Sequence, residues 1–272
     1  MTFAFRILIF FFLGYGALVA LVYLRQSRML YFPDTRLPPE AALPDLGLQS
    51  WPHADSSSYM GLYGSFQGEV ARGLVIVFHG NAGAAWQRVH YVRALAPLGF
   101  NVVLAEYPGY GGRGGEHSEV SFVSDARRVV ERAYMDFGGP VYLWGESLGC
   151  GVVGGVAADS PVDLSGIILT TPWDSLPALA QALYWYFPAK LIVRDQYNNI
   201  SNLQSYDGRV AVAIAGRDEI IGRKHSMRLY DRLTGEKRLW MFETAGHNNW
   251  PTAPTEPWWG EVMDFLSSAQ DG

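Results

Sequence analysis

The sequence predicts a mostly parallel, doubly wound α/β sheet preceded by one transmembrane helix. Short apolar runs alternate with amphipathic segments along most of the chain, as they do in successive βα units. Several of these runs are apolar on both faces, which is typical of strands in the middle of a sheet that helices cover. A separate apolar stretch opens the chain. The length of 272 residues suits one α/β domain with a short extra segment.

The composition excludes several classes of protein. Apolar residues make up 49% of the chain and charged residues 17%, so we expect a large buried core rather than disorder. The formal net charge of -5 argues against nucleic acid as the main partner, because phosphate binding normally needs a basic face. Cys150 is the single cysteine, so an intramolecular disulfide is impossible. Because Cys and His residues do not pair at ligand spacing, we expect neither a metal nor another cofactor.

The N-terminal stretch, residues 3–24, is almost wholly apolar and is interrupted only by Arg6 and by small residues. A helix of this length spans roughly the 30 Å hydrocarbon layer of a bilayer. Tyr23 and Arg25 begin the fringe of aromatic and basic residues that is expected at a membrane interface. We therefore predict that residues 1–32 are a membrane anchor and its fringe, in a single-pass membrane protein.

Two other interpretations of this stretch are a cleaved signal peptide and a buried core helix. Cleavage after Ala20 would place Leu18 at the −3 position, where a small residue is needed. A core helix is apolar on one stripe, whereas this segment is apolar all round. Basic residues lie on both sides of the span, so the positive-inside rule favours a cytoplasmic main domain only slightly, and the side of the membrane stays open.

Residues 33–272 are predicted to form the α/β domain. It begins with an extended linker marked by Pro33, Pro38, Pro39 and Pro44. The clearest strands are expected at residues 73–78, 101–106, 141–144, 166–169, 210–215 and 238–242. Helical patterns lie between several of them, notably at residues 86–98 and 120–137. A longer aromatic excursion at about 173–207 would either cover the carboxyl edge of the sheet as a lid or simply pack on the sheet.

The strongest motif is Gly-Glu-Ser-Leu-Gly at residues 145–149, which matches G-x-S-x-G. It directly follows the strand at 141–144 and precedes a helical stretch of small residues at 150–158. This strand–turn–helix context predicts a strained turn that exposes Ser147 as a nucleophile, since the flanking glycines let strand and helix approach closely. The alternative is an ordinary glycine-rich turn between a strand and a helix.

Two partners follow Ser147 in the order that this motif requires, first an acid and then a histidine. Asp218 and His247 both lie just past the carboxyl ends of predicted strands, where catalytic groups of open α/β sheets gather. We expect His247 to take the Ser147 proton and Asp218 to orient the imidazole. Asp174 is a rival acid after an earlier strand, and Glu219 is a weaker one. A further histidine, His225 in a predicted helix at 223–233, is expected at the surface.

An oxyanion hole needs two N–H donors. The backbone N–H of Leu148, just after the nucleophile, is one expected donor. The loop after the strand at 73–78 reads His-Gly-Asn-Ala-Gly, and Asn81 in it is the best candidate for the second backbone donor. His79 precedes the nucleophile strand and is expected to brace this loop rather than act as a base.

The sequence blocks together resemble the membrane-anchored ABHD-type α/β hydrolases, which are close to serine-aminopeptidase-like relatives. The blocks are residues 79–83, 107–111, 145–149, 216–218 and 246–248, together with the apolar start and the Tyr-Phe-Pro that follows it. The resemblance implies the α/β-hydrolase fold and an esterase, lipase, thioesterase or, less often, amidase activity. Some relatives remove acyl groups from proteins or cleave lysophospholipids. Gly222 is a departure, since relatives often have Pro after the acid loop.

Other interpretations stay open. Gly109, Gly111 and Gly114 spell G-x-G-x-x-G, but a dinucleotide site wants an acidic residue at a later strand end, so a tight turn bordering the site is favoured. A peptidase or amidase would favour a carboxylate near the pocket, for which Glu106 and Glu116 are candidates. A non-catalytic membrane-anchored scaffold would usually have lost one member of the triad. The leading expectation is hydrolysis of an ester or thioester, with a small-molecule or lipid substrate.

Overall fold

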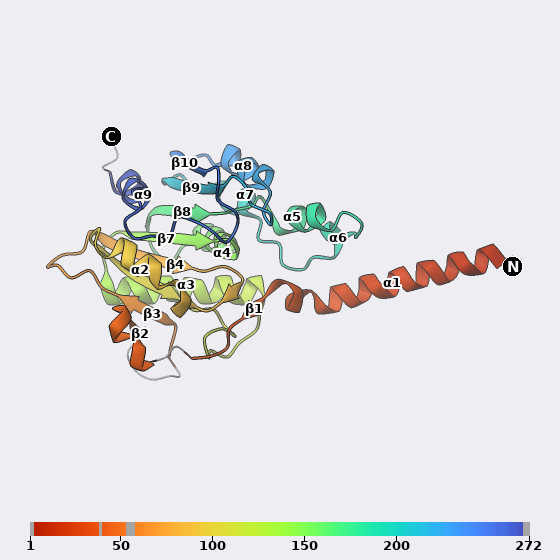
Figure 1. Ribbon diagram of the computed structural model, residues 1–272, viewed down its shortest axis with the longest axis horizontal. Coiled ribbons are helices and arrows are strands. Elements are labelled where there is room, and N and C mark those ends of the chain that lie inside the picture. The colour runs from red at the N-terminus through yellow and green to blue at the C-terminus, as the bar shows by residue number, and fades with distance from the viewer. Residues whose placement is uncertain (1–2, 38–39, 53–57, 269–272) are drawn as a thin grey trace.

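The computed structural model describes residues 3–37, 40–52 and 58–268. Pro38 and Pro39 of the predicted linker lie outside these ranges. A rounded α/β domain carries one long helix, α1 (Phe3–Leu30), which projects away from it (Figure 1). The 28 residues of α1 have a mean hydropathy of 2.5 in their most apolar window, and no residue of that window is buried. Within the described residues, α1 is the one helix that is long and apolar enough to cross a membrane.

The domain is built on one eight-stranded sheet with the order β10-β9-β8-β7-β4-β6-β3-β2. Its strands are β2 (Gln49–Trp51), β3 (Gly61–Gly64), β4 (Gly73–Phe78), β6 (Phe100–Ala105), β7 (Val141–Glu146), β8 (Leu164–Thr170), β9 (Val210–Ala215) and β10 (Lys237–Phe242). The strands from β6 to β10 are parallel, whereas β3 and β2 run antiparallel at one edge. All six predicted strands are confirmed, with shifted ends at four of them.

The sequence patterns missed the two antiparallel edge strands, because both are short. A second, two-stranded sheet was also missed: β1 (Phe32–Pro33) pairs in parallel with β5 (Ala82–Gly83). This small sheet joins the end of α1 to the loop that follows β4. Two segments about 50 residues apart in the sequence are therefore paired at the C-terminal end of α1.

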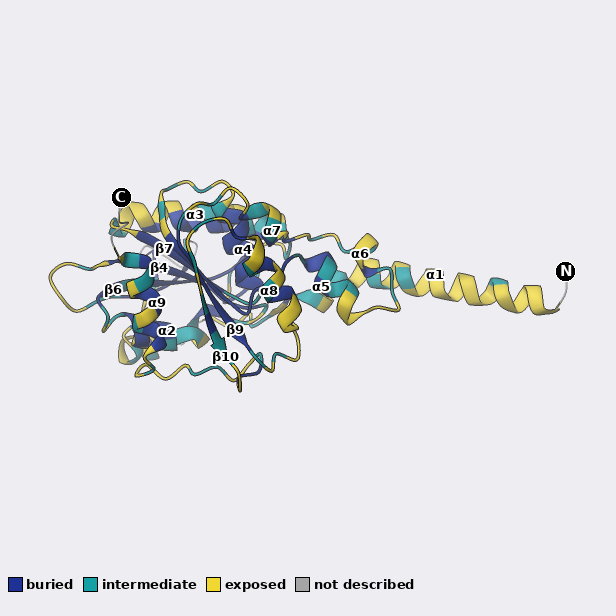
Figure 2. Ribbon diagram, turned by 90° about the horizontal axis from the view of Figure 1, so that it is seen from above, coloured by how far each residue is buried: buried dark blue, intermediate teal, exposed yellow. Residues whose placement is uncertain are grey.

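Helices cover both faces of the large sheet (Figure 2). They are α2 (Val89–Leu95), α3 (Glu119–Phe137), α4 (Leu148–Ala157), α5 (Leu176–Leu183), α6 (Ala189–Ile192), α7 (Asn199–Asn202), α8 (Arg223–Arg232) and α9 (Trp258–Ser267), with 3-10 turns η1 (Glu40–Ala42), η2 (Pro44–Leu46) and η3 (Ala85–Arg88). The helix predicted at 86–98 is divided between η3 and α2. The one predicted at 120–137 is confirmed as α3, where the Ser118 side chain caps the first turn by accepting from the Ser121 N–H.

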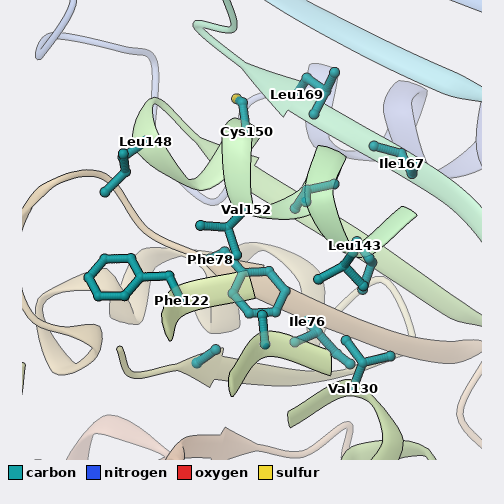
Figure 3. Close-up of a cluster of buried hydrophobic side chains, with 14 of the residues drawn as sticks. Ile76, Phe78, Phe122, Val130, Leu143, Leu148, Cys150, Val152, Ile167 and Leu169 are labelled. Carbon is teal, nitrogen blue, oxygen red and sulfur yellow. The ribbon is translucent and has the colours of Figure 1, made fainter. Parts of the chain in front are cut away.

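The alternation of side chains along β4 separates two hydrophobic cores. Leu74, Ile76 and Phe78 point to the core under α3 and α4, whereas Val75 and Val77 point to the core under α2 and α9. Figure 3 shows the first core, in which side chains of β4, β7 and β8 meet those of α3 and α4. Because both faces are covered, the central strands are apolar throughout, as their sequences predicted.

Candidate active site

Ser147 lies on a sharp turn between β7 and α4. Its φ angle is 51°, a conformation that costs energy for a residue with a Cβ. The flanking glycines are required by space. A Cβ on Gly149 would lie 1.9 Å from the Phe78 carbonyl oxygen, and one on Gly145 would lie 2.7 Å from the Cα of Cys150. The strained turn expected from the motif is therefore present, with the serine at its apex.

Ser147, His247 and Asp218 form one hydrogen-bonded row. The Ser147 Oγ lies 3.1 Å from His247 Nε2, and His247 Nδ1 lies 2.9 Å from Asp218 Oδ2. The other oxygen of Asp218 accepts hydrogen bonds from the backbone N–H groups of Ile220 and Ile221, at 2.9 and 2.7 Å. The carboxylate is thus fixed, and it keeps the imidazole proton on Nδ1 so that Nε2 faces the serine as an acceptor.

The rival acid Asp174 is committed elsewhere. Its side chain is buried and bonds to His225 Nδ1 at 2.8 Å and to the Arg228 guanidinium. The expectation that His225 is a surface residue is wrong, because His225 is only 8% exposed. Its ring turns inwards from α8 to meet Asp174, which anchors that helix to the loop after β8.

Glu219, the weaker rival acid, supports the histidine instead of orienting its ring. Its carboxylate accepts a hydrogen bond from the backbone N–H of His247 at 3.1 Å. The residue before it, Gly246, donates its N–H to the Asn249 side chain. Both contacts hold the loop that carries His247. No sequence pattern indicates this role, because the pairing of β9 with β10 brings the two loops together.

Hydrogen bonds to both the side chain and the backbone carbonyl of Asn81 fix the loop after β4. The Asn81 side-chain amide donates a 2.7 Å hydrogen bond to the carbonyl of Leu30, the last residue of α1. The Asn81 carbonyl accepts from the Phe32 N–H at 2.9 Å and from the Tyr110 hydroxyl at 2.8 Å. The loop is therefore fixed to the chain that emerges from the long helix.

His79 orients the peptide group that precedes Asn81. Its Nδ1 lies 2.7 Å from the Gly80 carbonyl oxygen, and its Nε2 lies 3.1 Å from Glu106 Oε1 in a buried pair. Because a trans peptide holds its C=O and N–H in opposite directions, this bond turns the Asn81 N–H away from His79. The bracing role expected for His79 agrees with these contacts. Leu148 is the first residue of α4, where a helical N–H has no acceptor within the helix.

An ion pair that the sequence patterns did not predict lies beside the nucleophile. Glu146 receives a bidentate contact from the Arg88 guanidinium, with N–O distances of 3.0 to 3.2 Å, and a hydrogen bond from the Tyr91 hydroxyl. Burial raises the pKa of Glu146, but the charge and hydrogen bonds of Arg88, together with the charges of His90 and His79, outweigh it and hold that pKa below its usual value. The partners lie 58 residues apart, so no local pattern could have revealed them.

A cavity of about 740 Å³ opens beside Ser147 and His247. Its polar lining includes Asn81, Arg88 and Glu146. The rest of its lining is mainly apolar and comes mostly from α1, from α5 and α6, and from the segment between these two helices. The position of α5 and α6 next to α1 is visible in both ribbon views (Figures 1 and 2).

The remaining residues that the sequence singled out, Cys150 and the glycines of the G-x-G-x-x-G match, have structural positions. In the described part of the chain, no group of three or more His, Cys, Asp or Glu side chains could hold a metal ion. Cys150 is fully buried, which raises the pKa of its thiol well above the usual value. Gly109 and Gly111 have positive φ angles, and a Cβ on Gly111 would lie 2.0 Å from the carboxylate of Glu106. These glycines form the tight turn that the sequence favoured over a dinucleotide site.

Comparison with known sequences identifies relatives over most of the chain. Residues 69–205 match the family model described as serine aminopeptidase, S33. An uncharacterized protein of Mycobacterium tuberculosis is 30% identical over 243 residues, which cover 86% of this chain and 84% of that protein. The lysophosphatidylserine lipase ABHD12 of Danio rerio is 25% identical over 257 residues, which cover 80% of this chain and 67% of the relative.

Solved structures show the same fold. The Pyrococcus furiosus esterase PF2001 superposes with a TM-score of 0.67 at 18% identity, covering 87% of this chain and 96% of the esterase. The monoacylglycerol lipase of Paleococcus ferrophilus superposes with a TM-score of 0.57 at 21% identity, covering 76% of this chain and 98% of the lipase. The chain therefore has the α/β-hydrolase fold, and it belongs to the serine aminopeptidase S33 family as a serine hydrolase of the esterase or lipase type.

Proposed function

We propose that this protein is a membrane-anchored serine hydrolase that cleaves carboxylic esters or thioesters through an acyl-enzyme. Ser147 is its nucleophile, His247 its general base and acid, and Asp218 the group that orients His247. The observation that carries the proposal is the row of hydrogen bonds from Asp218 to Ser147, which ends in a mainly apolar cavity. No metal or cofactor is needed for this chemistry.

The reaction follows from the positions of these groups. As Ser147 Oγ attacks the carbonyl carbon, its proton passes to His247 Nε2, and Asp218 stabilises the resulting imidazolium. The backbone N–H groups of Leu148 and Asn81 are assigned to the developing oxyanion. His247 then gives the proton to the leaving alcohol or thiol. Water, deprotonated by His247, cleaves the acyl-enzyme and restores Ser147.

The anchor is assigned to residues 1–32 and the hydrolase domain to residues 33–272, with the excursion at about 173–207 lying over the site. Support for the anchor comes from α1, whose apolar side chains are exposed along most of its length. An exposed helix of this hydropathy is costly in water, because burying apolar surface in lipid is favourable at about 25 cal/mol per Å². Membrane insertion accounts for the exposed surface.

Ester or thioester hydrolysis is favoured over peptidase or amidase activity by the carboxylates. Glu106 is buried against His79, and Glu116 is exposed and does not line the cavity. The two carboxylates that do line it are engaged: Glu146 with Arg88, and Asp195 with the Tyr31 hydroxyl and the Glu119 N–H. A free carboxylate that would hold a substrate amine is therefore missing from the described lining.

Labelling with a fluorophosphonate probe tests the proposal. Detergent-solubilised wild type should be labelled, Ser147→Ala should not, and Ser201→Ala should be labelled like the wild type, since Ser201 lies exposed on α7. Positive labelling would be followed by p-nitrophenyl esters and acyl thioesters of increasing length. If folded wild type shows neither labelling nor turnover, the non-catalytic scaffold replaces the hydrolase.

A further inference from the structure

We propose that α1 forms one wall of the acyl-binding site, so that the acyl chain of the substrate reaches Ser147 from within the bilayer along this helix. The substrate class is then a long-chain acyl ester or thioester that resides in the membrane. This inference rests on the proposed function of Ser147, but it assigns to the anchor a role that anchoring alone does not require.

The cavity next to Ser147 extends along one face of α1. Its lining includes Leu18, Val22, Gln26, Met29 and Leu30. The first three recur every four positions, and Leu30 continues the same row, so they share one face of the helix. From Leu18 to Leu30 the lining covers about 18 Å of the helix axis at about 1.5 Å per residue, a distance comparable to a long acyl chain.

The opposite wall comes from α5, α6 and the residues that join them. Leu179, Leu183 and Phe187 are among its lining side chains. Direct contacts hold this wall against α1. The Tyr15 hydroxyl donates to the Tyr186 carbonyl at 3.0 Å, and the ring of Tyr15 lies 5.9 Å from that of Phe187.

The same two walls are joined nearer to the active site. The Gln26 side chain donates to the Ile192 carbonyl at 3.1 Å and accepts from the Arg194 N–H at 2.8 Å. The Arg194 guanidinium also lies over the Tyr23 ring, 5.2 Å from its centroid. The anchor and the excursion therefore form one structural unit around the cavity.

The far end of this cavity lies at the depth of the lipid tails if α1 spans the bilayer. Arg25 marks the interface, and Leu18 precedes it by seven positions, about 10 Å deeper along the helix axis. The tip of the excursion is also suited to lipid. Trp185 is 78% exposed and Leu191 85% exposed, and exposed apolar side chains are stabilised when lipid rather than water surrounds them.

The polarity of the cavity sets the orientation of the substrate. Asn81, Arg88 and Glu146 line the cavity together with Ser147, and Gln26 on α1 is hydrogen-bonded to the excursion, whereas Val22 and Leu18 beyond it on α1 are apolar. An ester with its carbonyl at Ser147 would therefore point its acyl chain along α1. The alcohol or thiol part would remain beside the polar lining, near the water that deacylation requires.

The test compares the same substitution on two faces of α1. Leu18→Trp enlarges a side chain that lines the cavity and so fills part of its volume. Leu24→Trp enlarges a side chain that is 70% exposed and does not line the cavity. Full-length wild type and both variants are placed in phosphatidylcholine vesicles. For each, kcat/KM is measured with p-nitrophenyl dodecanoate and with p-nitrophenyl acetate.

We expect Leu18→Trp to lower the dodecanoate-to-acetate ratio by roughly tenfold or more, the effect of excluding about two methylenes from the site. Leu24→Trp should keep the wild-type ratio. An unchanged ratio in Leu18→Trp, or an equal loss in both variants, would overturn the role of α1 while leaving the hydrolase intact. Failure of the proposed function itself would look different, because the wild type would then hydrolyse neither ester.

Discussion

The side-chain amide of Asn81 caps the carboxyl end of α1 through its 2.7 Å hydrogen bond to the Leu30 carbonyl. The last carbonyls of a helix have no partner within the helix, so this bond satisfies one of them. Asn81 is also the proposed second oxyanion donor. One residue therefore connects the long apolar helix to the catalytic loop, and the pairing of β1 with β5 strengthens the connection.

Asn81→Ala should weaken catalysis while keeping the backbone donor. Loss of a whole oxyanion donor costs about 10²–10³ in kcat, so a loosened one should cost roughly tenfold. The measurement is kcat on a soluble p-nitrophenyl ester. Asn198→Ala is the matched control, because Asn198 is exposed and only caps α7, and its kcat should equal that of the wild type. A wild-type kcat in Asn81→Ala would show that the hydrogen bond from Asn81 to the end of α1 does not contribute to catalysis.

The two candidate acids should respond differently to amidation. Asp218→Asn should lower kcat by about 10⁴-fold, because the amide no longer holds the correct imidazole tautomer. Asp174→Asn should leave kcat within about twofold but destabilise the fold by roughly 1–3 kcal/mol, since a buried carboxylate that bonds His225 and Arg228 is lost. Ester turnover and thermal unfolding measure the two effects. Reversed roles would identify Asp174 as the catalytic acid.

Two Gly→Ala substitutions test the steric requirement of the nucleophile turn. Gly149→Ala places a Cβ 1.9 Å from the Phe78 carbonyl, so it should destabilise the protein by about 1–3 kcal/mol or more and displace Ser147. Gly260→Ala in α9 meets nothing within 4 Å and should gain up to about 1 kcal/mol from helix propensity. Thermal unfolding and probe labelling report both. Full labelling of Gly149→Ala would show that the turn tolerates a Cβ.

Glu146 should contribute a pH-dependent part of the stability. Because Arg88 holds its pKa below the ordinary 4.5 in the folded state, the stabilisation is fully present above that value and is lost as pH falls through the lower folded pKa. At neutral pH, hydrogen bonds to a charged group of this kind contribute roughly 1.5–3 kcal/mol. Between about pH 6 and about pH 3, the melting temperature of Glu146→Gln should therefore fall less than that of the wild type.

The control for this experiment is Glu69→Gln, since Glu69 is exposed in the loop between β3 and β4. The melting temperature of this variant should change with pH as that of the wild type does. The same change with pH in all three proteins would mean that the Glu146–Arg88 pair does not stabilise the fold.

Local patterns in the sequence determined the parts of the structure that depend on local burial. Apolar runs marked six strands, because a strand covered on both faces is apolar at every position. The motif around Ser147 marked the turn, because only glycine fits where β7 and α4 meet. The order of Asp218 and His247 after Ser147 was readable for the same reason: each lies at the end of a recognisable strand.

The tertiary structure decided which distant groups meet. The pairing of Glu146 with Arg88 and the inward turn of His225 towards Asp174 both depend on packing between separate βα units, which no residue spacing encodes. The cavity wall is the clearest case. Uniform hydrophobicity marks α1 as suited to lipid but does not distinguish the face with Leu18 and Val22 from the rest. That difference arises only when α5 and α6 pack beside the helix, because a cavity is a property of two surfaces rather than of one sequence.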